Sequence, residues 1–451
     1  MDQTPLDRRG FLRQASARAG ALSLGASALA APAAGADDKG PLALLGGKPV
    51  HTARWPAWPQ IAANDEAAWQ KVLRQRRWCR LDGTYADAFE KAYAQLTGTR
   101  HCTATANGTS ALFASVNALG VGPGDEVLVP PYTFVATINV VLLQYALPVF
   151  IDTDRQTSQM DAAKVAAAVT GRTACIIPVH LGGNAADLDT IGAVARKHSL
   201  PVVEDACQAH LGEWKGKKLG SVGRCGCFSF QVTKNLSSGQ GGAIITDDGE
   251  QMEKGYAFHN NGRGRRRGAD FSYPSGGANL RMTEFQAALL LEQMTRLDEQ
   301  SKAREDNARY LTRQLEEIPG IAPARSYPGC TRNAYHIYML RYDPEKFAGV
   351  PRAKFLRALR AEGVPCSPGY TPLNRQAFLK EALGSKAYRR IYGDKRLKDY
   401  WEANRCPEND RLCGEAVWMG QTMLLAGRAD MDQVAAAVRK IQANAGKLAK
   451  A

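Results

Sequence analysis

Short apolar runs recur along this chain, and stretches in which apolar positions follow a helical spacing separate the early ones. Each run is bounded by Gly, Pro, Asp or Asn, which is typical of buried strands, whereas the stretch at 109–120 has the pattern of a crossover helix. Strands that alternate with helices predict a mainly parallel sheet covered on both faces. We therefore predict an α/β fold with a seven-stranded sheet, built from residues 101–107, 125–130, 147–152, 174–179, 201–205, 226–230 and 241–246.

A second pattern begins after about residue 300 and predicts a smaller C-terminal α/β domain. Residues 335–342 have the spacing of a strand, and 351–362 and 431–445 have that of helices. We predict a large domain over 37–300 and a small one over 301–451. The stretch 384–409 is rich in basic and aromatic residues and shows no clear chemistry, so it stays unassigned.

The first 36 residues have the features of a targeting segment. Arg8 and Arg9 precede the apolar run AGALSLGASALAA, which is too short to span a membrane as a permanent helix. This predicts a cleaved twin-arginine signal over 1–36, with export of the folded protein to the periplasm or beyond. The alternatives are a disordered tail or a start codon placed too early on a cytoplasmic protein.

Composition allows a large globular enzyme and argues against other classes. The chain has 451 residues, 45% of them hydrophobic, and a formal charge of +14 that favours anionic ligands. The basic cluster at 263–267 lacks stacking aromatics, so we predict no nucleic-acid partner. Ten cysteines without CxxC pairs and seven histidines without ligand spacing predict no metal site. Pairing of Cys406 with Cys413 stays open.

The candidate site residues stand at or just after the ends of four of the predicted strands, and in a parallel sheet such positions meet at one edge. A lysine amine can form a Schiff base with an aldehyde, and an aspartate can pair with a pyridine nitrogen. Backbone amides at a helix start can hold a phosphate. Each residue alone has a plain structural explanation as a cap, a core ring or a surface lysine, but their joint order predicts a pyridoxal phosphate (PLP) site. The residues are Gly108 and Thr109, Phe134, Asp205, Ser229 and Lys234.

Several motifs together resemble the DegT/DnrJ/EryC1/StrS aminotransferases. They are the run NGTSALFASVNALGVGPGDEVLVPPYTFVATINVVLLQYALPVFIDTD, EDACQAH, FSFQVTKN, GQGGAIITDD and GANLRMTEFQAALLLEQ. The resemblance extends from about residue 45 to the C-terminus. It implies a fold-type-I PLP enzyme that aminates keto sugars or ketocyclitols. The segment 367–373 is similar to that of members acting on cyclic ketones such as scyllo-inosose.

The resemblance also implies individual roles and a homodimer. Lys234 would carry the cofactor as an internal aldimine, Asp205 would pair with its ring nitrogen, and Gln208 would contact its ring hydroxyl. Phe134 would stack on the ring, and Gly108, Thr109 and Ser229 would hold the phosphate. Asn279 would reach the phosphate of the neighbouring subunit. His336 is a candidate substrate ligand. His210 could also lie near the substrate, and for both histidines a buried structural role is an equal alternative. Arg281 on a donor carboxylate competes with a role in an interface ion pair.

Two departures shape the functional prediction. Gln240 stands where the family commonly has glutamate, which removes a charge but keeps the flanking glycines. The predicted export is the second departure, because family members are typically cytoplasmic and nucleotide-linked sugars are made there. Export therefore favours an unactivated keto sugar or ketocyclitol over a nucleotide-linked one. The expected amino donor is glutamate or glutamine. The alternatives are a nucleotide-keto-sugar aminotransferase and a non-catalytic or regulatory PLP-binding protein. A dehydratase of the same fold is disfavoured, because that branch of the family has histidine in place of the lysine.

Overall fold

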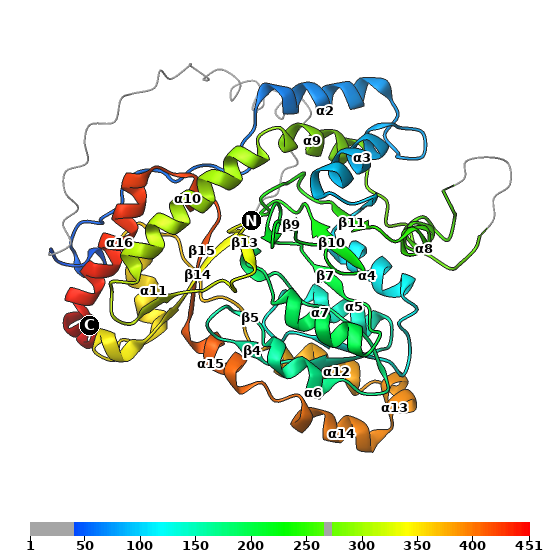
Figure 1. Ribbon diagram of the computed structural model, residues 1–451. Helices are drawn as coiled ribbons and strands as arrows, with labels where there is room; N and C mark the ends of the chain where they lie inside the picture. Colours follow the sequence, from blue (N-terminus) through cyan, green and yellow to red (C-terminus); the bar gives the residue numbers. More distant parts are fainter. Residues whose placement is uncertain (1–39, 266–272) are drawn as a thin grey trace, which may run out of the picture. The chain divides into compact units, whose positions relative to one another are not determined.

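The computed structural model describes residues 40–265 and 273–451 of the chain (Figure 1). The twin arginines and the apolar run behind the export prediction lie outside the described residues, as do Arg266 and Arg267. Export therefore stays a prediction. Among the described residues, no helix is both long enough and apolar enough to cross a bilayer.

Among the described residues, the central sheet contains the seven strands that the apolar pattern predicts. One part has the order β1–β11–β10–β7 and the other the order β3–β2–β6. Parallel bridges from Ile176 to Val202 and from Val179 to Asp205 join the two parts. β11 runs antiparallel to both of its neighbours, while the other pairings are parallel, which confirms the predicted fold class. The strands are β1 (His101–Thr105), β2 (Glu126–Val129), β3 (Leu147–Phe150), β6 (Thr173–Ile176), β7 (Val203–Asp205), β10 (Cys225–Ser229) and β11 (Gly242–Thr246).

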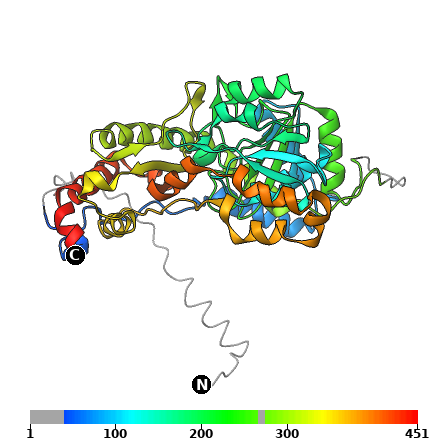
Figure 2. The ribbon, with the colours of Figure 1, turned by 90° about the horizontal axis from the view of Figure 1, so that it is seen from below.

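Helices cover both faces of this sheet, because successive strand residues point to opposite sides. In β2, Val127 and Val129 pack with α4, α5 and the rest of one core, whereas Leu128 packs with Ile191 of α7 in another. Figure 2 shows helices on both sides of the strands. The covering helices are α4 (Gly108–Ala118), α5 (Ala136–Leu143), α6 (Val165–Ala168), α7 (Leu188–Lys197) and α8 (Gly249–His259).

One buried carboxylate connects the first helices of the chain to a helix two hundred residues later. Glu284 is fully buried, and its oxygens accept the backbone N–H groups of Thr84 at 2.7 Å, Tyr85 at 2.6 Å and Ala86 at 3.0 Å. A negative charge at these N–H groups stabilises the start of α3. Glu284 thereby fastens α9 to α3 beside the β1 side of the sheet. The helices are α2 (Ala63–Gln75), α3 (Tyr85–Thr97) and α9 (Glu284–Met294).

The C-terminal part has a core of its own around a three-stranded antiparallel sheet of order β12–β14–β15. Leu311, Tyr342, Phe355 and Val434 meet in that core. The strand and the two helices expected from the spacing are observed as β14, α11 and α16. The elements are α10 (Leu297–Leu315), β12 (Ile321–Pro323), β14 (Ile337–Tyr342), α11 (Arg352–Ala361), β15 (Ala416–Gly420), α16 (Arg428–Ala443) and α17 (Ala445–Lys450).

The stretch that the sequence left unassigned forms helices that pack on the large sheet. Three tyrosine hydroxyls donate to backbone carbonyls beside β3: Tyr388 to Ala146 at 2.9 Å, Tyr392 to Tyr145 at 2.8 Å and Tyr400 to Pro148 at 2.7 Å. These helices, which are orange in Figure 1, therefore cover the sheet at edge strand β3. The division into domains at about residue 300 stays a prediction. The helices are α12 (Ala377–Leu383), α13 (Lys386–Tyr392), α14 (Asp394–Ala403) and α15 (Pro407–Glu415).

Cys406 and Cys413, whose pairing the sequence left open, are both free thiols in the structure.

Short strands complete the described part of the chain. The short strands are β4 (Thr153–Asp154), β5 (Gln159–Met160), β8 (Glu213–Trp214), β9 (Lys217–Lys218) and β13 (Cys330–Arg332).

Candidate active site

A cavity of about 820 Å³ lies at the carboxyl ends of the parallel strands, where the sequence places its polar residues. It also receives residues from β14 and from the segment that follows α11. Eight of the nine predicted site residues line it, and Asn279 does not. The eight are Gly108, Thr109, Phe134, Asp205, Gln208, Ser229, Lys234 and His336.

Lys234 reaches the cavity from a tight loop that follows β10. The loop is closed by backbone hydrogen bonds, from Phe230 N to the Gly241 carbonyl at 2.8 Å and from Val232 N to the Gly239 carbonyl at 3.0 Å. Burial lowers the pKa of the Lys234 amine, and the nearby Asp205 carboxylate opposes this shift only in part. The amine therefore loses its proton more readily than an exposed lysine would, which is the state that a nucleophile or a base requires.

Asp205 presents a fixed carboxylate at the end of β7. The residue is buried, its Oδ2 accepts the Thr137 hydroxyl at 2.8 Å, and its Oδ1 accepts the Cys207 N–H at 3.2 Å. The Thr137 hydroxyl is itself 2.9 Å from that of Thr133. These two hydrogen bonds fix the orientation of the carboxyl group. A cationic group in the cavity would meet a negative charge that is already oriented.

The start of α4 forms an anion seat on one side of the cavity. Asn107 caps this helix by accepting the Ser110 N–H at 2.8 Å. The N–H groups of Gly108 and Thr109, which line the cavity, have no intrahelical acceptor because they stand in the first turn. Gly108 is required there, because an added Cβ would lie 2.7 Å from Ser229 Cβ and 2.8 Å from Cys207 Sγ. The hydroxyl groups of Thr109 and Ser229 lie beside these amides.

Phe134 is exposed in a place where an apolar residue would ordinarily be buried. It follows β2 and lines the cavity with 55% of its surface accessible. Phe134 is therefore not a core residue, and its ring is free to stack on a flat ligand. On the same cavity wall, Gln208 accepts the Gly182 N–H at 2.7 Å and donates to the Tyr370 hydroxyl at 3.3 Å.

Tyr370 is a lining residue that the sequence did not single out, although it lies inside the 367–373 segment. Its ring packs edge-on against Trp418 and Tyr132, with centroid distances of 4.6 and 5.8 Å. Burial raises the pKa of its hydroxyl to about 12, so the group stays protonated and can donate. Other lining residues beyond the prediction include Thr133, Cys207, Gln231, Thr233 and Gln240.

The two histidines considered in the sequence have different places. His210 lies in the core, bonded to the Tyr93 hydroxyl at 3.1 Å and to the Ser229 carbonyl at 2.9 Å, and burial lowers its pKa to about 3. It is a structural histidine. His336 lines the cavity, its Nδ1 is 3.1 Å from Asn235 Oδ1, and burial lowers its pKa well below the usual value.

The tautomer of His336 follows from its neighbour. The Asn235 side-chain nitrogen donates to the Ala334 carbonyl at 2.8 Å, so its oxygen must accept from His336 Nδ1. The neutral ring thus carries its proton on Nδ1 and keeps Nε2 as an acceptor.

Two residues with roles implied by the resemblance lie away from the cavity. Arg281 donates to Asn260 Oδ1 at 3.1 Å, and Asn279 is exposed and forms a backbone bridge with Asn260. Neither contributes to the site of its own chain in this structure.

The model of the DegT/DnrJ/EryC1/StrS aminotransferase family matches residues 59–439. The chain belongs to this family. L-glutamine:2-deoxy-scyllo-inosose aminotransferase of Streptoalloteichus tenebrarius is 37% identical to it over 433 residues, covering 90% of this chain and 99% of the relative. The 3-amino-5-hydroxybenzoate synthase of Amycolatopsis mediterranei is 32% identical to it, and the match covers 84% of this chain and 95% of the relative. The crystal structure of a 3-amino-5-hydroxybenzoic acid synthase superposes with a TM-score of 0.76 at 32% identity. The superposition covers 87% of this chain and 99% of that structure.

The predicted fold-type-I architecture and aminotransferase activity are thereby confirmed. Members of this family are PLP-dependent, and the residues around the cavity fit that cofactor. The amine of Lys234 can react with the aldehyde of PLP, and the fixed carboxylate of Asp205 can pair with its pyridine nitrogen. The anion seat at α4 can hold its phosphate. The exposed ring of Phe134 suits its flat face.

Proposed function

We propose that this aminotransferase moves the amino group of L-glutamine to a ketocyclitol of the 2-deoxy-scyllo-inosose type, with PLP bound at Lys234. The observation that carries the proposal is the 37% identity, over nearly the full length of both chains, to an enzyme with that activity. The cavity supports it. It offers a lysine whose pKa burial lowers, a fixed carboxylate and a histidine acceptor.

When bound, PLP supplies an electron sink that stabilises negative charge at the carbon bearing the amino group. Lys234, which burial biases toward the neutral amine, takes the proton from the α-carbon of the donor. In the second half of the reaction it returns a proton to the carbon that becomes the amine carbon of the product. Asp205, which Thr137 and Cys207 hold in place by hydrogen bonds, would pair with the pyridine nitrogen of the bound cofactor.

Substrate recognition would fall to the neutral acceptor and donor groups around the cavity. His336 Nε2 accepts a hydroxyl proton of the cyclitol, and the Tyr370 hydroxyl can donate to an oxygen. Both groups are uncharged, which suits a polyhydroxylated ketone that carries no phosphate or nucleotide.

The proposal predicts a clear order of substrates for the PLP-loaded protein. With L-glutamine as donor, we expect kcat/KM for 2-deoxy-scyllo-inosose to exceed that for a nucleotide-linked keto sugar by about 100-fold or more, since a site built for hydroxyls discriminates strongly. The measurement is product amine by mass spectrometry. Equal or better use of the nucleotide-linked sugar would assign the alternative function. A protein that binds PLP but releases no keto acid from glutamine would be the non-catalytic scaffold.

A homodimer with shared sites belongs to the proposal. Asn279 lies outside its own cavity, which is the arrangement expected if it serves the neighbouring subunit. The helix α2 and the loop after it present exposed apolar side chains, with Trp69 44%, Leu73 50% and Trp78 50% accessible. Trp69 and Trp78 both contact Phe285, with ring centroids 4.7 and 5.7 Å away. A second copy would cover this surface.

Light scattering on the purified protein should give twice the mass of one chain. Replacing Trp69 and Leu73 together by serine should shift the protein toward the monomer and lower activity in parallel, because apolar area at the interface is lost. The matched control is Leu143→Ser on α5, which is equally exposed and should leave the mass unchanged. An active monomer would show that the site needs no partner.

A further inference from the structure

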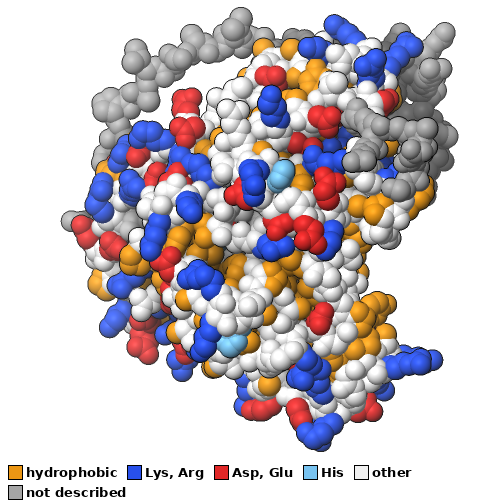
Figure 3. Space-filling model, turned by 45° about the vertical axis from the view of Figure 1, so that its right-hand side comes forward, with side chains coloured by type: hydrophobic (Ala, Val, Ile, Leu, Met, Phe, Trp, Pro, Cys, Tyr) orange, Lys and Arg blue, Asp and Glu red, His pale blue; other side chains and the backbone are white. Residues whose placement is uncertain are grey.

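The helices that cover edge strand β3 carry a marked excess of positive charge. Residues 375–405 contain nine basic and four acidic residues, a difference of +5 out of the +14 of the whole chain. Over the face shown in Figure 3, Lys and Arg side chains are interspersed with Asp and Glu. The aminotransferase mechanism uses none of these residues, so the charge on these helices calls for another explanation.

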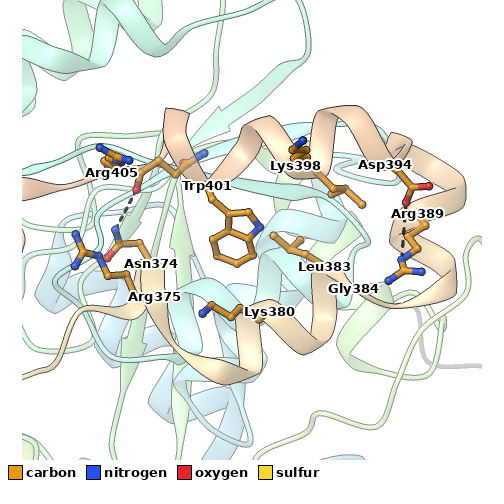
Figure 4. A pocket seen from close by; sticks show the side chains of 12 residues that line it. Asn374, Arg375, Lys380, Leu383, Gly384, Arg389, Asp394, Lys398, Trp401 and Arg405 are labelled. Atoms are coloured by element: carbon orange, nitrogen blue, oxygen red, sulfur yellow. Dashed lines mark hydrogen bonds and ion pairs between the residues drawn. The ribbon is translucent and has the colours of Figure 1, made fainter.

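The same helices enclose a second cavity. It has a volume of about 850 Å³, lies among α12, α13, α14 and the turn before α12, and shares no lining residue with the active site (Figure 4). Sites for small molecules are usually about 300–1,000 Å³. The cavity is therefore large enough for a compound of the size of a mononucleotide.

The middle of the cavity is a flat aromatic surface. The indole of Trp401 lies between Leu383 on one side and Asn374 with the Arg375 and Arg405 side chains on the other (Figure 4). An indole face of this kind binds a planar or ring-shaped group by stacking.

A buried polar atom points to a ligand independently. Asn374 is 97% buried, its nitrogen donates to the Asn404 carbonyl at 3.0 Å, and its Oδ1 has no hydrogen-bond partner among the described residues. Since a buried polar atom without a partner is costly, a donor group from a ligand would satisfy it.

The cations around the cavity form two groups. The guanidinium groups are tied to carboxylates, with Arg375 bonded to Asp410 and Arg389 3.9 Å from Asp394. By contrast, Lys380 on α12 and Lys398 on α14 form no ion pair with any described residue. They lie below and above the indole in Figure 4. An unpaired ammonium group such as that of Lys380 can bind an anion such as a phosphate monoester.

We propose that this cavity is a second binding site, for a phosphorylated ring compound. The ring stacks on Trp401, a ring donor bonds to Asn374 Oδ1, and the phosphate binds Lys380. A nucleotide and a sugar phosphate share this chemistry. An unphosphorylated ring would leave Lys380 unpaired, and inorganic phosphate would leave Trp401 and Asn374 without a partner.

The site is physically connected to the active site. Asn374 lies four residues after Tyr370, which lines the catalytic cavity and binds Gln208. In addition, Tyr388 of α13 donates to carbonyls at the end of α5, and the same helix carries the Thr137 that binds Asp205. A ligand that orders α12–α14 thus acts on two segments that reach the reacting groups.

Calorimetric titration of the PLP-loaded protein tests the proposal, because the bound cofactor occupies the anion seat at α4. We expect ADP, glucose 6-phosphate or both to bind at least about tenfold more tightly than adenosine, glucose or inorganic phosphate, since each parent compound makes only half of the contacts. The tighter of the two phosphorylated compounds identifies the source of the ligand.

Variants locate the binding. The change Lys380→Gln, and separately Trp401→Leu, should each weaken binding at least about tenfold while transamination without the ligand is unchanged. The matched control is Lys386→Gln, an exposed lysine on α13 that does not line the cavity. The proposal is overturned if neither compound binds at millimolar concentration, if inorganic phosphate binds equally well, or if Lys386→Gln weakens binding as much.

Discussion

Replacement of Lys234 by methionine abolishes transamination, with an expected loss in kcat of about 10⁴-fold or more. Proton transfer by a positioned side chain alone contributes about 10²–10⁴-fold, and the covalent link to the cofactor is lost as well. Methionine matches the length and apolar stem of lysine, so the half-buried position stays filled. The measurement is keto acid release from glutamine in single turnover.

The surface variant Lys217→Met provides the control, since that lysine is exposed on β9 and should retain full activity. More than a tenth of the wild-type rate in Lys234→Met would refute the role.

The stability of the cofactor-free protein, measured as a function of pH, tests the burial of Lys234 independently of catalysis. Burial lowers the folded-state pKa of Lys234 below its value in the unfolded chain, so its protonation penalises folding at neutral pH, and the penalty fades as pH rises toward the unfolded pKa. Cofactor-free Lys234→Met should therefore be more stable than wild type at pH 7.

Replacement of Asp205 by asparagine lowers kcat by about 10²–10⁴-fold while the fold is retained. The amide can keep its oxygen toward Thr137, which bonds the carboxylate at 2.8 Å, but it removes the charge that holds a proton on the pyridine nitrogen. The electron sink weakens, and the barrier to proton removal at the donor carbon rises. Steady-state kinetics at saturating PLP measures the effect.

A matched control separates charge from general damage. Asp189→Asn makes the same change at an exposed carboxylate that is paired with Lys215, and it should alter neither kcat nor the melting temperature. If Asp205→Asn stays within about threefold of wild type, the carboxylate has no such role. A melting temperature that falls together with activity would indicate a structural role instead, because loss of a fixed charge at an active site does not require loss of stability.

Much of the fold could be predicted because its signals are local. The seven sheet strands are short, nearly continuous apolar runs with Gly, Pro or Asp at their ends, and burial on both faces requires that composition. The convergence of Gly108, Asp205, Ser229 and Lys234 follows from the same pattern, because strand direction decides which edge a following residue reaches.

Other parts could not be predicted because their signals are not local. The basic and aromatic stretch at 384–409 looked without chemistry, since its tyrosines find their acceptors in carbonyls beside β3 more than 240 residues earlier in the chain. His210 and His336 were indistinguishable as sequence, but the first is enclosed by Tyr93 and the Ser229 carbonyl, and the second reaches the cavity.

By itself the sequence determined the sheet, the order of the site residues along it and the chemistry of a lysine and an aspartate at one edge. The tertiary structure alone decided three other features. It buries the Lys234 amine and so lowers its pKa, it brings Tyr370 to Gln208, and it gathers Asn374, Lys380 and Trp401 around one cavity. The physical reason is that desolvation and long-range contacts depend on segments far apart in the chain, whereas periodicity reports only on neighbours.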